Sequence, residues 1–157
     1  MRSVCFHPSG DFILAGTEHS MIRLYDISSL IPYTSSHAQD HHYGGINQVR
    51  YSLDGKMFAS ASKDGSIKFW DGVTHRCIKY IPNAHSGSEV CSVQFSKNGK
   101  YLLSSGKDST VRLWDLAKGS FLRSCYRSIA QALDPLTTSA RLAGPHWRRL
   151  RCLQECN

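Results

Sequence analysis

The fold is decided by the stretch Gly106-Lys107-Asp108-Ser109-Thr110-Val111-Arg112-Leu113-Trp114-Asp115, because the chain repeats it. A near copy runs from Ser62 to Asp71 and also ends in Trp-Asp. A third copy, from Thr17 to Asp26, ends in Tyr-Asp at the same phase. The closing aspartates lie 45 and then 44 residues apart. A repeat of this length with a Trp-Asp end predicts one four-stranded β-propeller blade for each copy.

Each copy carries the pattern of four strands. Alternating apolar residues before a glycine-containing turn predict the first strand, and a run of small and apolar residues predicts a second strand packed on both faces. The third strand ends at the aromatic–aspartate pair, and we expect fourth strands at Leu30–Thr34, Arg76–Tyr80 and Phe121–Cys125. The chain is therefore predicted to be all-β, a partial β-propeller of about three antiparallel blades at residues 1–34, 46–80 and 90–125. The polar, histidine-rich stretch 35–45 is predicted to be a loop.

The repeat ends at about Cys125, and residues 126–157 are predicted to form a basic, mostly disordered tail. This tail holds five arginines against Asp134 and Glu155, within a net charge of +7 for the chain. A short helix near Trp147 to Cys156 is an alternative for part of it. The basic excess also leaves open direct RNA binding through the tail.

Composition describes an ordinary soluble domain. The 157 residues are 41% hydrophobic and 20% charged, enough for one domain with a core. No apolar run approaches the length of a membrane span, and we find no targeting segment, so no membrane partner is expected. The six cysteines have no regular spacing, which favours reduced thiols in an intracellular protein over a disulfide framework.

Residues 1–125 resemble WD-repeat proteins. In that family a histidine before the first strand, a serine or threonine on the second, the turn aspartate and the tryptophan form a hydrogen-bonded brace. The resemblance implies such a brace of His85, Ser104 (or Ser105), Asp108 and Trp114 in the third copy. In the second copy it implies His42 (or His41), Ser60 or Ser62, Asp64 and Trp70, and we assign His42 and Ser62. The first copy has His19 and Tyr25 in place of the aspartate and the tryptophan, so its brace is expected to be incomplete or absent.

Neither catalysis nor metal binding is predicted. A catalytic triad needs one accessible nucleophile beside an oxyanion site, whereas here Asp, His and Ser recur in two copies that end in Trp. Two histidine-containing groups lack the paired short spacings of a zinc site: His37, His41 and His42, and His146 with Cys152 and Cys156. No phosphate-binding loop is present, so no cofactor is expected.

Several phrases resemble one family more closely, that of the WD-repeat subunit (subunit 1) of cleavage stimulation factor. They are Phe6–Leu14, Trp70–Val73 with Arg76–Ile78, Glu89–Ser92, Phe95–Asn98 and Leu103–Ser109. The resemblance implies a non-catalytic, nuclear protein-interaction scaffold in mRNA 3′-end cleavage and polyadenylation. Its implied partners are the other subunits of that factor, chiefly the large helical-repeat subunit, with indirect RNA contact and no small-molecule substrate.

Four charged residues are candidates for the partner-facing surface of such a scaffold: Glu18, Lys63, Glu89 and Lys107. The alternative for each is a solvated turn charge. Other assemblies that use WD-repeat adaptors, such as ubiquitin-ligase receptors and trafficking coats, remain an alternative function.

The chain departs from that family in its extent. The family has an amino-terminal dimerisation region and further blades, and propellers close with four to eight blades. Three blades are expected to leave two sheet faces uncovered, each exposing roughly a few hundred Å² of apolar surface. A truncated product, whose tail is read outside the family's frame and which has no function of its own, is therefore a further alternative.

Overall fold

The computed structural model describes residues 1–29, 31–35, 37–118 and 120–126. Met1–Cys125 form one structural unit, and the predicted disordered tail and the helix near Trp147 lie outside the described residues. Within the described part of the chain, no helix is long and apolar enough to cross a membrane.

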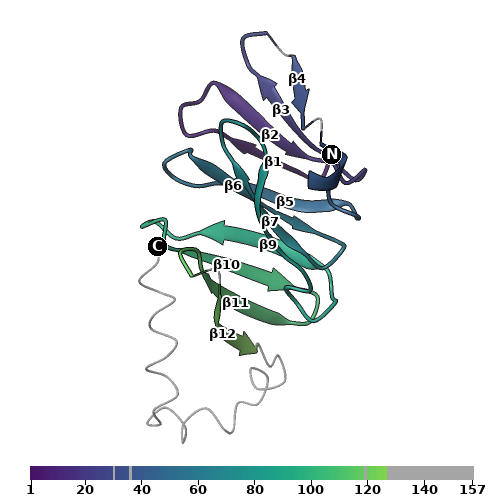
Figure 1. Cartoon of the computed structure of the whole chain (residues 1–157), viewed down its shortest axis with the longest axis vertical. Coiled ribbons are helices and arrows are strands. Elements are labelled where there is room, and N and C mark those ends of the chain that lie inside the picture. The colour runs from purple at the N-terminus through teal and green to yellow at the C-terminus, as the bar shows by residue number, and fades with distance from the viewer. Residues whose placement is uncertain (30, 36, 119, 127–157) are drawn as a thin grey trace, which may run out of the picture. The chain divides into compact units, whose positions relative to one another are not determined.

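The described chain folds into three four-stranded antiparallel sheets (Figure 1). Blade 1 contains β1 (Ser3–Phe6), β2 (Phe12–Gly16), β3 (Ile22–Asp26) and β4 (Pro32–Thr34). Blade 2 contains β5 (Ile46–Tyr51), β6 (Met57–Ser62), β7 (Ile67–Asp71) and β8 (Cys77–Ile81). Blade 3 contains β9 (Val90–Phe95), β10 (Tyr101–Gly106), β11 (Thr110–Asp115) and β12 (Phe121–Tyr126). A 3₁₀ turn, η1 (Ala38–Asp40), lies in the loop between β4 and β5. The prediction of an all-β chain made of partial-propeller blades is confirmed.

Strand order follows chain order in every sheet, and the register between second and third strands is the same in all three. Opposite the third strand, Ala15 faces Arg23, Ser60 faces Lys68 and Ser104 faces Arg112. These pairs fix which residues are equivalent between blades. The turn after each first strand contains a glycine in the left-handed region, with φ of 87° at Gly10, 70° at Gly55 and 68° at Gly99.

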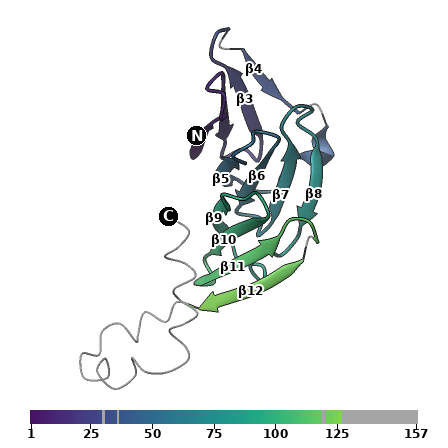
Figure 2. The same ribbon diagram turned by 90° about the vertical axis from the view of Figure 1, so that its left-hand side faces the viewer.

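The blades stack face to face along the chain, as Figures 1 and 2 show. Their first strands are in contact, β1 with β5 and β5 with β9. Two buried apolar clusters lie between the blades. The cluster between blades 1 and 2 consists of Leu14, Leu24, Ile46, Val49, Tyr51, Phe58 and Trp70. The cluster between blades 2 and 3 includes Ala59, Ala61, Ile67, Phe69, Val90, Val93, Phe95, Leu102 and Trp114.

Polar side chains also join the first strands across the blade boundaries. The backbone N–H of Val49 donates to the hydroxyl of Ser3 over 3.2 Å. At the equivalent place one blade on, the N–H of Val93 donates to Oε1 of Gln48 over 2.7 Å, and the Ser92 hydroxyl donates to the same oxygen. Blades 1 and 2 thus each offer an acceptor to an N–H on the first strand of the next blade.

The fourth strands form the outer edges of the sheets. β4 is three residues long and begins at Pro32, which lies opposite Tyr25. β8 pairs with β7 through a register shift between Phe69 and Trp70. The outer edge of blade 1 is therefore short, and that of blade 2 is irregular.

Candidate functional site

Blade 3 contains a buried chain of hydrogen bonds that links the turn before β11 to the sheet. His85 Nδ1 lies 2.9 Å from Asp108 Oδ1 and 3.1 Å from Thr110 Oγ1. On the other side of the ring, Nε2 lies 2.8 Å from Ser104 Oγ, which accepts a 2.8 Å hydrogen bond from Trp114 Nε1. The structure brings together all four residues assigned to this brace and selects Ser104 over Ser105.

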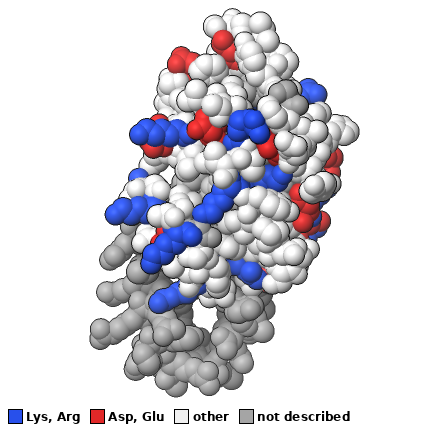
Figure 3. All heavy atoms as spheres, viewed as in Figure 1, with Lys and Arg blue, Asp and Glu red and all other residues white. Residues whose placement is uncertain are grey.

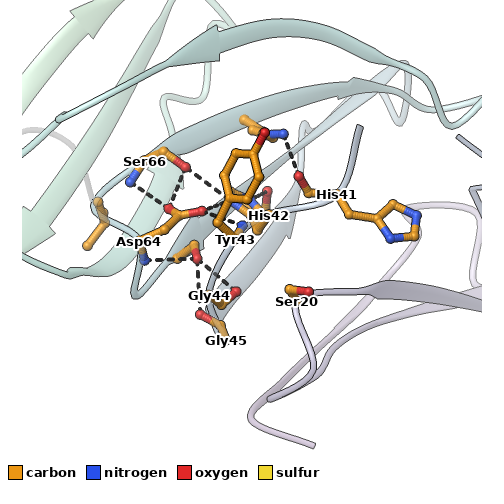
Figure 4. A network of polar contacts seen from close by, with 12 residues as sticks. Ser20, His41, His42, Tyr43, Gly44, Gly45, Asp64 and Ser66 are labelled. Atoms are coloured by element: carbon orange, nitrogen blue, oxygen red, sulfur yellow. Dashed lines mark hydrogen bonds and ion pairs between the residues drawn. The ribbon is translucent and has the colours of Figure 1, made fainter. Parts of the chain in front are cut away.

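Blade 2 repeats the arrangement with a different serine from the assigned one. His42 Nδ1 lies 3.0 Å from Asp64 Oδ2 and from Ser66 Oγ. His42 Nε2 lies 2.6 Å from Ser60 Oγ, which accepts a 2.9 Å hydrogen bond from Trp70 Nε1. Figure 4 shows the Asp64 carboxylate directed at His42 and Ser66, while the His41 ring points away from it.

The assignment of Ser62 to this brace is wrong in the structure. Ser62 is buried, but its hydroxyl lies 3.0 Å from the carbonyl oxygen of Gly44 and 3.1 Å from that of Gly45. It therefore holds the loop before β5 against the end of β6. Ser60 lies two residues before Ser62 on β6, further from the β6–β7 turn. At that position the indole N–H of Trp70 reaches its hydroxyl. His41, the alternative histidine, contacts the carbonyl oxygen of Ser35 instead.

The donors and acceptors of the brace determine its proton arrangement. An indole N–H can only donate, so the Ser60 oxygen accepts from Trp70. Of the two groups that contact this buried hydroxyl, only His42 Nε2 can accept its hydrogen. Nε2 is then the acceptor nitrogen of a neutral ring, and the Nδ1–H donates to Asp64. The same reasoning applies to Trp114, Ser104, His85 and Asp108. The geometry favours neutral histidines.

The pKa shifts agree with this arrangement. Burial lowers the pKa of both His42 and His85, although the partner carboxylates oppose the shift. Burial alone would raise the pKa of Asp64, but hydrogen bonds from His42 and Ser66 hold the pKa of that carboxyl well below its usual range. The pKa of Asp108 is lowered in the same way, with burial opposed by His85 and Thr110.

The brace serines are not placed to act as nucleophiles. Ser60 and Ser104 are buried, and each hydroxyl is in contact with a tryptophan on one side and a histidine on the other. A substrate carbonyl has no approach to either oxygen, whereas a triad serine must be reachable beside an oxyanion site. The Asp–His–Ser chain in these blades therefore stabilises the sheet.

Three brace-supporting residues were missed in the sequence. Lys68 is buried, and its Nζ donates to the carbonyl oxygens of Asp40 (3.1 Å) and His41 (2.7 Å), which fixes the loop that carries His42. Ser66 and Thr110 donate to the turn carboxylates over 2.5 and 2.8 Å. The sequence did contain a signal for Lys68, because a basic residue recurs at its position in the other two copies, as Arg23 and Arg112.

Blade 1 has no equivalent brace among the described residues. Ala15 occupies the register of Ser60 and Ser104 and offers no hydroxyl. Thr17 instead donates to the carbonyl oxygen of Met21 over 2.8 Å, closing the turn through a local bond. The sequence, with His19 and Tyr25 in place of the aspartate and the tryptophan, led us to expect that the brace of this blade is incomplete or absent, and the structure agrees.

The four charged residues proposed from the sequence lie on the turns between second and third strands or beside them, and they pair with one another. Lys63 Nζ donates to Glu18 Oε1 over 2.5 Å, from blade 2 to blade 1. Glu18 also pairs with Arg2, and within blade 3 Lys107 Nζ lies 2.8 Å from Glu89 Oε1. We call these five residues the charged row. Oppositely charged side chains also lie side by side on the face drawn in Figure 3.

Two neutral residues, Asn47 and Gly45, lie beside the charged row. Asn47 accepts from Arg2 Nη1 over 2.7 Å and donates to the carbonyl oxygen of Val90 over 2.8 Å, which joins all three blades. Gly45 lies beside Glu18, and a β-carbon there would be 3.0 Å from the Glu18 carbonyl oxygen. Hydrogen bonds from the lysines lower the pKa of Glu18 and Glu89, so both carboxylates are charged at neutral pH.

The described ranges contain no candidate metal cluster, and three of their cysteines are free. No group of three or more His, Cys, Asp or Glu residues is placed to hold an ion there, and Cys5, Cys77 and Cys91 are free thiols. The alternative zinc residues His146, Cys152 and Cys156 lie outside those ranges.

Comparison with known proteins assigns the repeats to a family model. The model described as WD domain, G-beta repeat matches residues 1–26, 33–71 and 76–115, which together form more than half of the chain. Each matched segment ends with the third strand of a blade, and two of them end at the Trp-Asp pairs. The second and third segments begin at the fourth strand of the preceding blade, so the sequence repeat is offset from the blades by one strand.

Three relatives with different names illustrate the range of similar proteins. Cleavage stimulation factor subunit 50 of Arabidopsis thaliana is 48% identical over 93 residues, 59% of this chain and 22% of the relative. Serine-threonine kinase receptor-associated protein of Bos taurus is 36% identical over 73 residues, 46% of this chain and 20% of the relative. Eukaryotic translation initiation factor 3 subunit I of Drosophila willistoni is 32% identical over 79 residues, 50% of this chain and 24% of the relative. The chain thus aligns with about a fifth to a quarter of the length of these relatives.

Proposed function

We propose that this chain, which belongs to the WD40 repeat family, is a non-catalytic protein-interaction scaffold of the mRNA 3′-end cleavage and polyadenylation machinery. The observation that carries the proposal is the 48% identity to cleavage stimulation factor subunit 50, well above the 36% and 32% to the other relatives. The partners are then other subunits of that factor, chiefly the large helical-repeat subunit. The site of action is the nucleus, and contact with RNA is indirect.

The charged row is the proposed contact surface. It consists of Arg2, Glu18, Lys63, Glu89 and Lys107 and alternates in sign across three blades, which suits a partner with a complementary pattern of charges. The two braces fix the turns that carry Lys63 and Lys107, because they bind the neighbouring aspartates Asp64 and Asp108. A rigid surface of this kind loses little conformational entropy when it binds.

The surface is also easy to test, because exposed ion pairs contribute little to folding stability. Reversing the charges of Lys63 and Lys107 should leave the blades folded and change only binding. The matched control reverses Lys97 and Lys100, which are exposed at the opposite end of β10. Both double variants change the net charge by the same amount.

The experiment is affinity purification of the tagged chain from nuclear extract, with immunoblots for each cleavage stimulation factor subunit. The native chain and the Lys97→Glu/Lys100→Glu control should recover the large helical-repeat subunit, and Lys63→Glu/Lys107→Glu should recover at least tenfold less. Equal recovery by both double variants would place the contact elsewhere on the chain. Absence of every cleavage stimulation factor subunit from the native sample would refute the proposed function.

A second candidate is a WD-repeat adaptor of another assembly, favoured by the similarity to kinase receptor-associated and translation initiation factor 3 proteins. The same purification from whole-cell extract separates the two. Recovery of translation initiation factor 3 subunits without cleavage stimulation factor subunits would support this second candidate.

A further inference from the structure

A recess lies between blades 1 and 2, and the third strands β3 and β7 both contribute to it. Its floor is apolar and consists of Leu14 and Leu24 from blade 1 and Phe58 and Trp70 from blade 2. Blades 1 and 2 lie in the same structural unit, and every residue that lines the recess is described, so the recess does not depend on blades beyond these two. No described side chain fills it.

Comparison with the next junction explains why the recess is there. Between blades 2 and 3, Ile81 lies opposite Ile67 and packs on the buried cluster. In blade 1 the same register places Ser35, one residue beyond Thr34, where blade 2 has Ile81. Protein interiors are close-packed, and a serine is too short and too polar to fill the space that an isoleucine takes. The first junction therefore lacks an aliphatic side chain that the second junction has.

The rim of the recess is polar, and the exposed charge beside it is positive. His75 lines the recess, and burial lowers the pKa of its ring, so it is neutral at pH 7. The next residue, Arg76, is exposed, whereas the carboxylate it pairs with, that of Asp40, is buried. Arg76 Nε donates to Asp40, and Nη1 lies 3.1 Å from His37 Nε2. Nη2 forms no hydrogen bond among the described residues and can donate to a further carboxylate.

We propose that this recess binds the aliphatic side chain of an isoleucine, leucine or valine in an extended acidic segment of a partner protein, and that a carboxylate of that segment pairs with Arg76. The anchor is aliphatic because Ile81 fills the equivalent space at the second junction. The segment is extended because Ile81 is the last residue of a strand. It is acidic because the exposed charge beside the recess is positive. This site is separate from the charged row, and it does not require the function proposed above.

The loop that forms one side of the recess is held in place by hydrogen bonds. Lys68 Nζ donates to the carbonyl oxygen of His41 over 2.7 Å, and Arg76 Nε donates to Asp40 Oδ2 over 2.7 Å. His41 Nε2 in turn lies 2.9 Å from the carbonyl oxygen of Ser35. A side chain that enters the recess therefore meets a site that is largely formed before binding, which keeps the entropy cost of binding low.

The test is a titration of the full chain with the blocked peptide acetyl-Glu-Ile-Glu-amide, followed by the NMR signals of the side-chain methyl groups. We expect the methyl signals of Leu14, Ile22 and Leu24 to shift, while those of Leu53, exposed in the β5–β6 turn, stay in place. Acetyl-Glu-Ala-Glu-amide should bind about tenfold more weakly, because alanine lacks most of the buried aliphatic area. Acetyl-Gln-Ile-Gln-amide should also bind more weakly, and high salt should remove this difference. Absence of shifts at the recess, or binding of either control peptide as tightly as the first, would overturn the proposal.

Two variants fill the recess with side chains that the chain itself uses at the second junction. Ser35→Ile copies Ile81, and Leu24→Phe copies Phe69, which occupies the same register in blade 2. Both should keep a β-type circular dichroism spectrum and lose the peptide-induced shifts, whereas Ser29→Ile, at an exposed serine, should bind like the native chain. Peptide binding that persists in either folded variant would contradict the site.

The same methyl signals distinguish a partner segment from the chain itself as the occupant. Signals of the native chain that move with protein concentration would assign the recess to a second copy. Nuclear Overhauser contacts between these methyl groups and residues 127–157 would assign it to that segment. Either result would overturn the assignment to a partner protein.

Discussion

The indole nitrogen of Trp70 lies 2.9 Å from the hydroxyl oxygen of Ser60, which also contacts His42. Ser60→Ala would leave the indole N–H and the imidazole nitrogen without partners in a buried place. A buried group left unsatisfied costs about 1–3 kcal/mol, so we expect the free energy of unfolding in urea to fall by that amount. Ser29→Ala, at an exposed position, should change nothing; an equal effect of the two substitutions would contradict the brace.

A double-mutant cycle tests the same contact directly. Trp70→Phe keeps most of the apolar ring and removes the N–H, so its cost should depend on whether Ser60 is present. We expect a coupling energy of about 0.5–3 kcal/mol between Ser60→Ala and Trp70→Phe. Simple additivity of the two costs would show that the indole and the hydroxyl do not interact.

Trp114 is expected to be the largest single contributor in blade 3. It is buried against Phe95 and Leu102, and Trp114→Ala removes that packing together with the bond to Ser104. Replacement of a buried aromatic residue by alanine costs about 3–5 kcal/mol. Thermal unfolding should detect this loss, with Tyr43→Ala, at an exposed ring, as the control; an unchanged melting temperature for Trp114→Ala would exclude a structural role.

Stability should fall in acid because of the two braces. The folded pKa of His42 and of His85 lies below the ordinary value of about 6.5, so the unfolded chain binds more protons as the pH drops below that value. The lowered pKa of Asp64 and Asp108 adds a further loss, which begins near the unfolded value of about 3.9 and continues toward their folded values. Melting temperature should therefore decline from pH 7 to pH 5 and more steeply below pH 4.

Histidine variants assign the upper part of this pH dependence. His42→Gln should lower stability at pH 7 and flatten the decline between pH 7 and pH 5, because the buried titrating ring is gone. His19→Gln alters an exposed histidine in the equivalent turn of blade 1 and should keep the native profile. A profile unchanged in His42→Gln would assign the decline to other groups.

The ammonium group of Lys68 should control the order of the loop before β5. Lys68→Met preserves the aliphatic length but leaves the carbonyl oxygens of Asp40 and His41 without their donor, at a cost of about 1–3 kcal/mol. Hydrogen exchange of the His42 and Tyr43 amides should accelerate more than that of the β7 amides. Lys118→Met, at an exposed position, is the matched control, and equal protection in both variants would show that Lys68 does not hold the loop.

The sequence predicted much of the fold because each blade is locally encoded. Period, turn residues and the aromatic–aspartate ends located the three sheets and their fourth strands, and the brace of blade 3 followed from the resemblance. Ser60 and Ser62 could not be separated, because residues two apart on a strand share a face. Only the position of Trp70 across the sheet distinguishes them.

Contacts between blades were beyond the sequence for a different reason. The pairing of Lys63 with Glu18 depends on how two sheets stack and on the absence of a side chain at Gly45. The anchoring of the loop by Lys68 depends on burial of a residue type that is usually exposed. The sequence shows a basic residue at the position of Lys68 in every copy, but it does not show where the side chain points.

The outer edge of blade 1 limits how the chain aggregates. β4 has three residues and starts at Pro32, which has no N–H to donate, so an incoming foreign strand finds little to pair with there. Amyloid-like growth needs a long, regular row of unpaired backbone groups. The outer edge of blade 1 should therefore not act as a template for fibril growth when the protein misassembles during synthesis or refolding.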